Sequence, residues 1–285
     1  MAIKDIFLPL VSYPVPTTVV AIEKAVAVAS RLGAEICATA VELEVPALAG
    51  PFTGALSPEG RAAAGQAPEH EKSVDNSKKM MQALEAAAKS WKTGCSQFIA
   101  PCVADDMGSV LAEQARLRDI SLVAVKDHDG RQEKMIEALL FRSGRPLLLF
   151  PENEVGVLSN SFDRVAIAWD HSAQSARAVG DALPVLQRAK AVRIVTASDD
   201  KNPSLRESGE ALIGHLARHG VQASFEKVEI GGSSVGKVFE AYVKANDIDL
   251  LVMGGYRHSR LREFVMGGAT NTILARPPCW VLMSH

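Results

Sequence analysis

The chain has 285 residues, of which 47% are hydrophobic, and its 31 basic and 33 acidic side chains leave a formal charge of −2. This length provides for about two domains of ~150 residues, each with a packed core. The near-neutral charge excludes a global field that would favour nucleic acid or an anionic membrane, so any anion site has to be local. The sequence contains no apolar run that approaches the ~18 residues of a membrane span.

The cysteine pattern is typical of a reduced compartment. The four thiols lie far apart without a CxxC pair: Cys37, Cys95, Cys102 and Cys279. Three of the four are in or beside apolar runs, where a thiol packs as a small hydrophobe. The N-terminal stretch MAIKDIFLPLV has too few apolar residues for a secretory signal. We therefore expect a cytoplasmic protein with neither a membrane nor a nucleic-acid partner.

Strand-like apolar runs alternate with helix-like stretches along the chain, which indicates parallel sheets with crossover helices. In the first half we expect strands at 5–10, 35–41, 96–101, 120–125 and 146–150, and helices at 16–32, 68–92, 107–117 and 132–141. In the second half we expect strands at 164–169, 192–197, 223–229, 249–253 and 279–283, and helices at 172–189, 203–219, 235–245 and 269–274.

The two halves also repeat in letters. DISLVAV at 119–125 matches DIDLLVM at 247–253, and GRPLLLF at 144–150 matches ARPPCWVLM at 275–283. A tandem duplication explains this, with domains at 1–151 and 163–285 joined by a polar linker. The first half alone carries an insert at 44–68, rich in Ala, Gly and Pro, for which a surface loop is favoured over a lid or a partner-binding element.

Candidate binding residues gather in the second half. In a doubly wound sheet, ligands bind at the C-terminal ends of the strands, where the strand order reverses. Asp170 follows the first strand of this half, Ala197 ends the second, and Gly254 and Gly255 end the fourth. Glycines there would let the backbone approach a ligand without a Cβ in the way.

The segment after these glycines has the composition of a phosphate site. Gly267 and Gly268 precede the last helix, which has Ala269 and Thr270 in its first turn and whose N-terminal N–H groups form a ready anion site. Between the two glycine pairs stand cationic side chains that can donate forked hydrogen bonds to phosphate oxygens: Arg257, His258, Arg260 and Arg262.

The alternating α/β unit, the Asp that closes the first strand and the late glycine loop before a final helix and strand resemble the universal stress protein family, here as a tandem two-domain member. The resemblance covers both halves apart from the insert. It implies two Rossmann-like domains of the adenine nucleotide alpha hydrolase-like fold, each a five-stranded parallel sheet flanked by helices. It also implies ATP, with Mg²⁺, in the second half, where Asp170 would face the adenine or ribose and Ala197 would offer backbone to the base.

Members of that family that bind ATP carry G-x2-G-x9-G-[S/T] after the fourth strand. Gly254 and Gly267 match the first and third glycines, whereas Arg257 stands at the second and Gly268 at the hydroxyl position. The expected function is thus a stress-response regulator that binds ATP in its second half. The alternative is a nucleotide-free module of the same fold that docks another protein.

The first half departs further from this pattern. Its first strand ends in residues 10–12, LVS, where an Asp would be expected, and its fourth continues as VKDHDGRQEK, with Gly130 as the one loop glycine. Phosphate would meet Asp127 and Asp129 there, so no nucleotide is expected in this half.

Three other motifs have simpler explanations. The DHD at 127–129 could be drawn as a metal site, but a solvated turn is favoured; His215 and His219 have zinc-like spacing, but suit a helix C-terminus better. GGSSVGK at 231–237 has P-loop spacing but lacks the Ser or Thr after the lysine, so Ser233 or Ser234 more simply caps a helix. No metal is expected. No nucleophile–base set is apparent, so catalysis is not indicated beyond slow ATP hydrolysis.

Each half ends in a strongly apolar strand that would form an exposed edge. We expect residues 147–150 and 279–282 to pair antiparallel about a pseudo-twofold axis and to bury Trp280, which would make the chain a dimer of its own halves and leave a further homodimer open. The alternative is two loosely linked domains that cover their own edges.

Overall fold

The computed structural model describes residues 2–44, 68–126, 130–152, 161–199, 203–255 and 268–285. Most of the insert and of the linker therefore lies outside the described residues. The first half contains β1 (Asp5–Val11), α1 (Val19–Leu32), β2 (Glu35–Leu43), α3 (Pro68–Trp91), β3 (Cys95–Cys102), α4 (Met107–Ala115), β4 (Ile120–Val125), α5 (Gly130–Arg142) and β5 (Leu147–Pro151). The second half contains β6 (Arg164–Ala168), α6 (Ala173–Leu186), β7 (Ala191–Ala197), α7 (Pro203–Arg218), β8 (Ala223–Val228), α8 (Val235–Ala245), β9 (Leu250–Gly254), α9 (Gly268–Ala275) and β10 (Trp280–Ser284).

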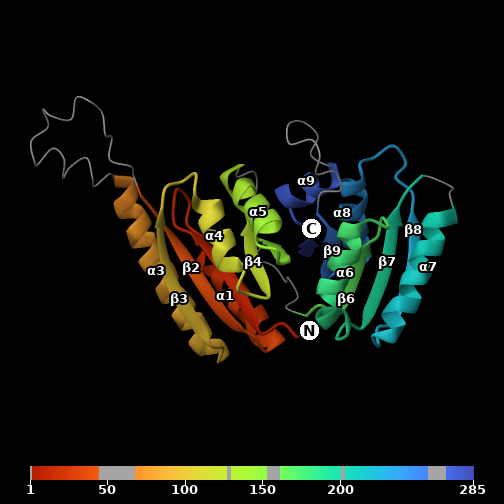
Figure 1. Cartoon of the computed structure of the whole chain (residues 1–285), viewed down its shortest axis with the longest axis horizontal. Helices are drawn as coiled ribbons and strands as arrows, with labels where there is room; N and C mark the ends of the chain where they lie inside the picture. Colours follow the sequence, from red (N-terminus) through yellow and green to blue (C-terminus); the bar gives the residue numbers. More distant parts are fainter. Residues whose placement is uncertain (1, 45–67, 127–129, 153–160, 200–202, 256–267) are drawn as a thin grey trace, which may run out of the picture.

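The strands form one ten-stranded sheet in the order β3-β2-β1-β4-β5-β10-β9-β6-β7-β8 (Figure 1). Within each half the strands are parallel, and the second half repeats the strand order of the first. The expected fold class, two five-stranded parallel units flanked by helices, is confirmed. The largest differences in element bounds are at α1, which begins at residue 19 rather than 16, and α6, which ends at 186 rather than 189. Thr18 caps α1 by accepting a hydrogen bond from the N–H of Ala21.

The two halves meet at the antiparallel pair β5–β10, as the apolar end strands predict. Val281 lies opposite Leu149, and Leu282 opposite Leu148. Trp280 has no exposed surface, and its ring centroid lies 4.5 Å from that of Phe150 on the facing strand. The β5 edge of the first half and the β10 edge of the second are thereby paired with each other inside the chain.

The described helices cover the two faces of this sheet, four on each face. Side chains of α1, α3, α6 and α7 share one hydrophobic cluster with one face of the sheet, and those of α4, α5, α8 and α9 share a second cluster with the other face. Both clusters run across the β5–β10 seam. The halves therefore share their cores, which disagrees with the alternative of two loosely linked domains.

Candidate functional site

Strand β6 marks the point in the second half where the strand order reverses, because it lies between β7 and β9. Ala168 near its end is in register with Val195 of β7 and with Met253 of β9. The C-terminal ends of these three parallel strands thus share one edge of the sheet. The register brings together, at that edge, the predicted site residues Asp170, Ala197 and Gly254.

Asp170 is exposed just beyond β6. Its Oδ1 accepts a hydrogen bond from the N–H of Ser172 at 3.0 Å, and Ser172 in turn caps α6 by accepting from the N–H of Ser175 at 3.1 Å. Among the described residues, Oδ2 of Asp170 has no hydrogen-bond partner. The turn therefore fixes the Asp170 carboxylate beside the C-terminal ends of β6, β7 and β9 and leaves one acceptor oxygen for a ligand.

Trp169, which precedes this turn, is hydrogen-bonded to α7 and β7. Its ring is buried, and its Nε1–H donates to Ser208 Oγ of α7 at 3.1 Å. Its carbonyl accepts from Thr196 Oγ1 at 2.8 Å, and its N–H donates to the carbonyl of Val195 at 2.9 Å. These bonds tie the end of β6 to the end of β7, where the half-buried Ala197 closes the strand.

Gly254 and Gly255 have a role that differs from the one expected. A Cβ on Gly254 would lie 2.6 Å from the backbone N of Ser175 and 2.7 Å from the carbonyl carbon of Gln174, so α6 fills the space that the glycine leaves. A Cβ on Gly255 would lie 2.7 Å from Leu140 of α5, and its N–H donates to the carbonyl of Ser284 at 2.8 Å. Protein packing is thus sufficient to explain a glycine at each of these two positions, and their approach to a ligand stays a prediction.

Helix α9 begins at Gly268, which is exposed; among the described residues, no atom outside its own helix lies within 4 Å of the place where a Cβ would be. Thr270 is buried two residues further on. The helix is held against α8, since a Cβ on Gly236 would lie 2.6 Å from Cβ of Thr272. The first turn of α9, with Gly268, Ala269 and Thr270, therefore belongs to a helix packed against α8. The other predicted phosphate-site residues lie outside the described residues: Arg257, His258, Arg260, Arg262 and Gly267.

The corresponding edge of the first half is bridged by a lysine. In the repeat, Lys126 follows DISLVAV as Gly254 follows DIDLLVM. Lys126 Nζ donates to the carbonyls of Val15 and Pro16, at 2.7 and 2.9 Å, in the loop after β1. It also lies 3.5 Å from Oε2 of Glu152, which is 1% exposed. This side chain spans the reversal point between β1 and β4.

Helix α3 closes the same edge from the other side. It has 24 residues, against 16 in α7, and its first turns carry hydroxyl groups onto the strand ends. Ser73 Oγ lies 2.6 Å from Ser12 Oγ and accepts from the N–H of Leu43 at 2.7 Å, while Asn76 Nδ2 donates to the carbonyl of Ser12 at 2.9 Å. Sequence reasoning missed both closures, although the Lys126–Gly254 correspondence was visible in the repeat.

The P-loop interpretation of GGSSVGK finds no support in the geometry. Oδ1 of Asp199 accepts from the N–H groups of Ile230 and Gly231, at 2.7 and 3.1 Å, so a carboxylate of the chain already occupies these donors. Ser234 caps α8 by accepting from the N–H of Lys237 at 3.4 Å, which confirms the capping interpretation.

The two histidines near the end of α7 are ring neighbours. His215 and His219 have centroids 4.8 Å apart. Among the described residues, no group of three or more His, Cys, Asp or Glu side chains is placed to hold a metal ion. The motif at 127–129 lies outside the described residues.

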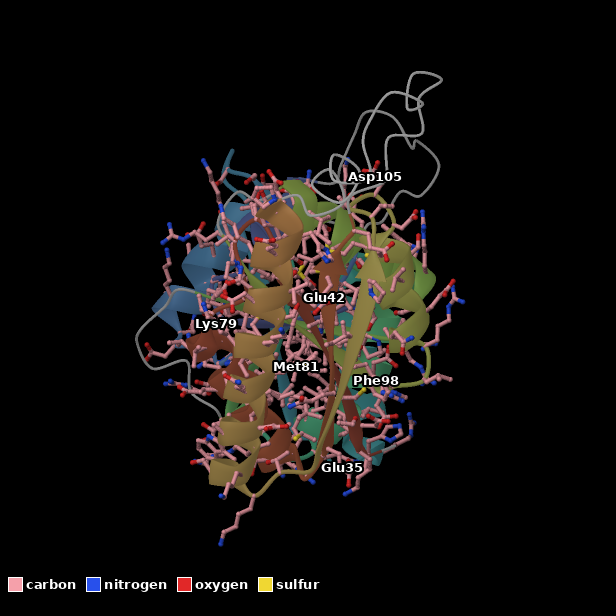
Figure 2. All side chains as sticks on the ribbon, turned by 90° about the vertical axis from the view of Figure 1, so that its left-hand side faces the viewer. Glu35, Glu42, Lys79, Met81, Phe98 and Asp105 are labelled. Carbon is pink, nitrogen blue, oxygen red and sulfur yellow. The ribbon has the colours of Figure 1, made fainter. Side chains whose placement is uncertain are left out.

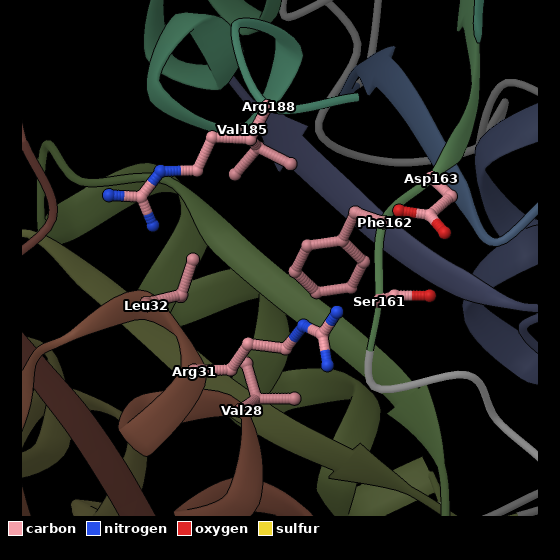
Figure 3. Close-up of a pocket in the computed structure, with 8 residues that line it drawn as sticks. All are labelled: Val28, Arg31, Leu32, Ser161, Phe162, Asp163, Val185 and Arg188. Carbon is pink, nitrogen blue, oxygen red and sulfur yellow. The ribbon is translucent and has the colours of Figure 1, made fainter. Parts of the chain in front are cut away.

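A pocket of about 160 Å³ lies between α1 and α6, at the opposite end of the strands from the candidate site (Figure 3). Phe162 lies at its centre, and the guanidinium groups of Arg31 and Arg188 point to different sides of that ring. Both arginines are exposed; Arg31 is in the last turn of α1, where a cation balances the helix dipole, and Arg188 follows the C-cap of α6. Because they do not converge on one point, the pocket does not form an anion site.

The second half of the chain matches a known protein family. The model of the universal stress protein family matches residues 161–285. A universal stress protein from Archaeoglobus fulgidus has a similar structure, with a TM-score of 0.66 and 13% identity over 98% of this chain and 97% of that one. A Pseudomonas aeruginosa chain described with the same family name has a TM-score of 0.60 and 14% identity, over 99% and 93%.

No curated protein matches the chain. At these identities the two structures show a shared fold over the full length. In the part of the chain that the structure describes, no helix is long and apolar enough to cross a membrane. The family match falls on the half in which Gly254 stands at the place of Lys126: residues 161–285 are similar to the universal stress protein family.

Proposed function

We propose that the chain is a stress-response regulator that binds ATP in its second half, at the edge formed by β6, β7 and β9. The observation that carries the proposal is the difference between the halves at the strand-order reversal. Lys126 bridges this point in the first half, whereas Gly254 takes its place in the second, between the exposed Asp170 and the start of α9. The family match covers this same half.

Each described residue has a role in this proposal. Asp170 accepts hydrogen bonds from the base or ribose through Oδ2, which has no partner among the described residues, and the backbone at Ala197 borders the base. The first N–H groups of α9, at Gly268, Ala269 and Thr270, meet the phosphates. Arg257, His258, Arg260 and Gly267 complete the phosphate site, and Mg²⁺ accompanies the nucleotide. We further propose domains at 1–151 and 163–285 and a cytoplasmic location.

One observation favours the rival, a nucleotide-free module that docks another protein. The spaces beside Gly254 and Gly255 are filled by α6 and α5, so neither glycine leaves room for a ligand through its missing side chain. Calorimetry of the full chain separates the two functions. One ATP per chain is expected to bind, and an absence of heat up to millimolar ATP overturns the nucleotide proposal.

Two sets of variants locate the site. Asp170→Ala is expected to reduce the preference for ATP over bare triphosphate, while Arg257→Ala and Arg260→Ala weaken ATP by about 1–3 kcal/mol each, the contribution of a charge-assisted hydrogen bond. The matched controls are Asp75→Ala, on the exposed face of α3, and Arg218→Ala at the end of α7. Equal effects in site and control variants would place the nucleotide elsewhere.

Trp169 supplies a local optical readout. Its indole is buried directly beneath Asp170 and hydrogen-bonded to Ser208. Occupation of the site is expected to change the tryptophan fluorescence of the wild type, and Trp169→Phe to abolish that change while ATP still binds. A change that survives in Trp169→Phe would report binding near another tryptophan.

A further inference from the structure

The two edges of the described sheet differ in how they are protected. Strand β8 at one edge exposes Glu226 and Lys227, and charged side chains on an edge discourage pairing with another chain. Strand β3 at the other edge, CSQFIAPC, contains no charged residue and exposes Phe98 and Ile99, which are 49% and 52% accessible. Strand β3 thus has the features of an edge that accepts a partner strand.

The hydrogen-bonding groups on the outer side of β3 can be assigned from its pairing with β2. The carbonyls of Gly94 and Cys102 accept from N–H groups at the two ends of β2, so even-numbered residues face β2. The N–H and C=O groups of Cys95, Gln97 and Ile99 therefore point outward. Among the described strands, β3 has a neighbour on this one side only, and Figure 2 looks directly onto it, with Phe98 on the strand beside α3.

The two exposed apolar side chains lie on opposite faces of the sheet. Gln97 Nε2 donates to the carbonyl of Met81 at 3.0 Å, which places the odd-numbered side chains on the α3 face. Cys102 packs in the cluster that contains Leu111 of α4, so Phe98 is on the α4 face. A partner strand would consequently find one apolar contact on each face of the edge.

We propose that β3 pairs antiparallel with β3 of a second copy of this chain, with Phe98 opposite Phe98 on the twofold axis. In this register Gln97 of each copy exchanges two backbone hydrogen bonds with Ile99 of the other. Pro101, which has no N–H, falls opposite Cys95 at the end of the pair, where the proline costs one bond. The two phenylalanine rings face each other as a non-hydrogen-bonded pair, the closest cross-strand spacing.

Charge at the ends of the strand selects this arrangement. Lys92 precedes β3, and Asp105 and Asp106 follow it; all three are exposed. The antiparallel register brings Lys92 of one copy beside Asp105 of the other, twice per dimer, whereas a parallel partner would place like charges together. Pairing of β3 with β8 of another copy would meet Glu226 and Lys227 and would leave an open chain of molecules, while the β3 pair closes on itself.

The oligomeric state of the full chain tests the proposal. Light scattering is expected to give the mass of two chains, and Phe98→Glu and Ile99→Lys are each expected to give the mass of one, with unchanged circular dichroism because both side chains are half exposed. Ser224→Glu places the same charge on the exposed β8 edge and is expected to leave the dimer intact. A monomeric wild type, or a dimer that persists in Phe98→Glu, overturns the proposal.

Cysteine cross-linking tests the register. In a Cys95→Ser background, Phe98→Cys is expected to form an intermolecular disulfide on mild oxidation, because residues 98 of the two copies lie opposite each other. Ile99→Cys in the same background is the matched control, since each residue 99 lies opposite Gln97 instead. Equal cross-linking of the two variants, or none at position 98, contradicts this register and with it the proposed pair.

Discussion

Trp280 of β10 lies against Phe150 of β5, with ring centroids 4.5 Å apart and planes inclined by 32°, across the line where the two halves meet. Both rings are fully buried, and Trp280 also contacts Phe162 edge-on at 5.8 Å. Trp280→Ala is expected to lower the free energy of unfolding by about 3–5 kcal/mol, through the lost burial and the cavity it leaves. Trp91→Ala, at a site 47% exposed, is the control and should change it little. If the two variants lost the same free energy of unfolding, Trp280 at the β5–β10 pair would contribute no more to stability than an exposed tryptophan.

Gly254 is expected to tolerate no side chain. Gly254→Ala would force Cβ to within 2.6 Å of the backbone of α6 and should cost about 1–3 kcal/mol in unfolding free energy, the usual range for overpacking. Gly268→Ala is the matched control, because in the described part of the chain no atom outside its own helix lies within 4 Å of its Cβ position. Chemical denaturation measures both. A Gly254→Ala protein as stable as Gly268→Ala would mean that α6 can move away freely.

Removing one partner of the Lys126–Glu152 ion pair in the first half is expected to lower the stability of the protein. Glu152 is buried, Oε1 accepts from the N–H of Thr18 at 2.5 Å, and Oε2 faces Lys126, whose side chain is 15% exposed. Glu152→Ala leaves the lysine charge without its partner and should lower stability by about 3–5 kcal/mol. The double variant Lys126→Met/Glu152→Met should recover part of that loss. A double variant that loses the sum of the single effects would contradict the coupling.

Two buried serines of α3 offer a comparison of satisfied and unsatisfied hydroxyls. Ser73 bonds Ser12 and Leu43, whereas Ser77 Oγ is buried without a hydrogen-bond partner among the described residues. Ser73→Ala should cost about 1–3 kcal/mol, because the N–H of Leu43 loses its acceptor, and Ser77→Ala should be neutral or stabilising. Thermal denaturation of the two variants distinguishes these outcomes. A reversed order would contradict the hydrogen bonds described for α3.

Tyr242 is expected to ionise late. Burial raises the pKa of its phenol, and the hydrogen bond that the phenol donates to Glu226 at 2.5 Å raises the pKa further, against a smaller opposing effect of Arg193. The fold therefore favours the neutral phenol, so this contribution to stability is present below the ordinary tyrosine pKa and is lost as the pH rises through the pKa in the folded protein. Ultraviolet titration should show a late component that Tyr242→Phe removes. An unaltered titration curve in that variant would assign the late component to another tyrosine.

The arrangement of strands was predictable because it depends on local pattern. Alternating apolar runs and helical stretches give the order of elements, the repeated letters give two copies of one unit, and two apolar end strands predict the β5–β10 pair. Asp170 and Ala197 could be placed at one edge for the same reason, since parallel strands in register end together.

The closures around the site could not be predicted, because they depend on contacts between distant residues. Lys126 bonds the carbonyl of Val15, 111 residues away, and nothing in the local sequence of either residue indicates this. The packing of α6 on Gly254 is likewise a tertiary contact, for which a glycine at a strand end is only a permissive signal. Gly254 and Gly255 therefore have a packing role that the sequence pattern did not indicate.

Because the β5–β10 pair joins two halves of one chain, each half can acquire substitutions independently of the other. In a symmetric dimer of two identical chains, any substitution appears in both subunits, so a lysine that bridged one strand edge would bridge the other as well. Here the two partners are joined in one chain, and their pairing does not depend on protein concentration. The first half therefore has Lys126 and Glu152 at positions where the second half has Gly254 and Ser284. The first half can thus keep a purely structural role, while substitutions that affect ligand binding can accumulate in the second half alone.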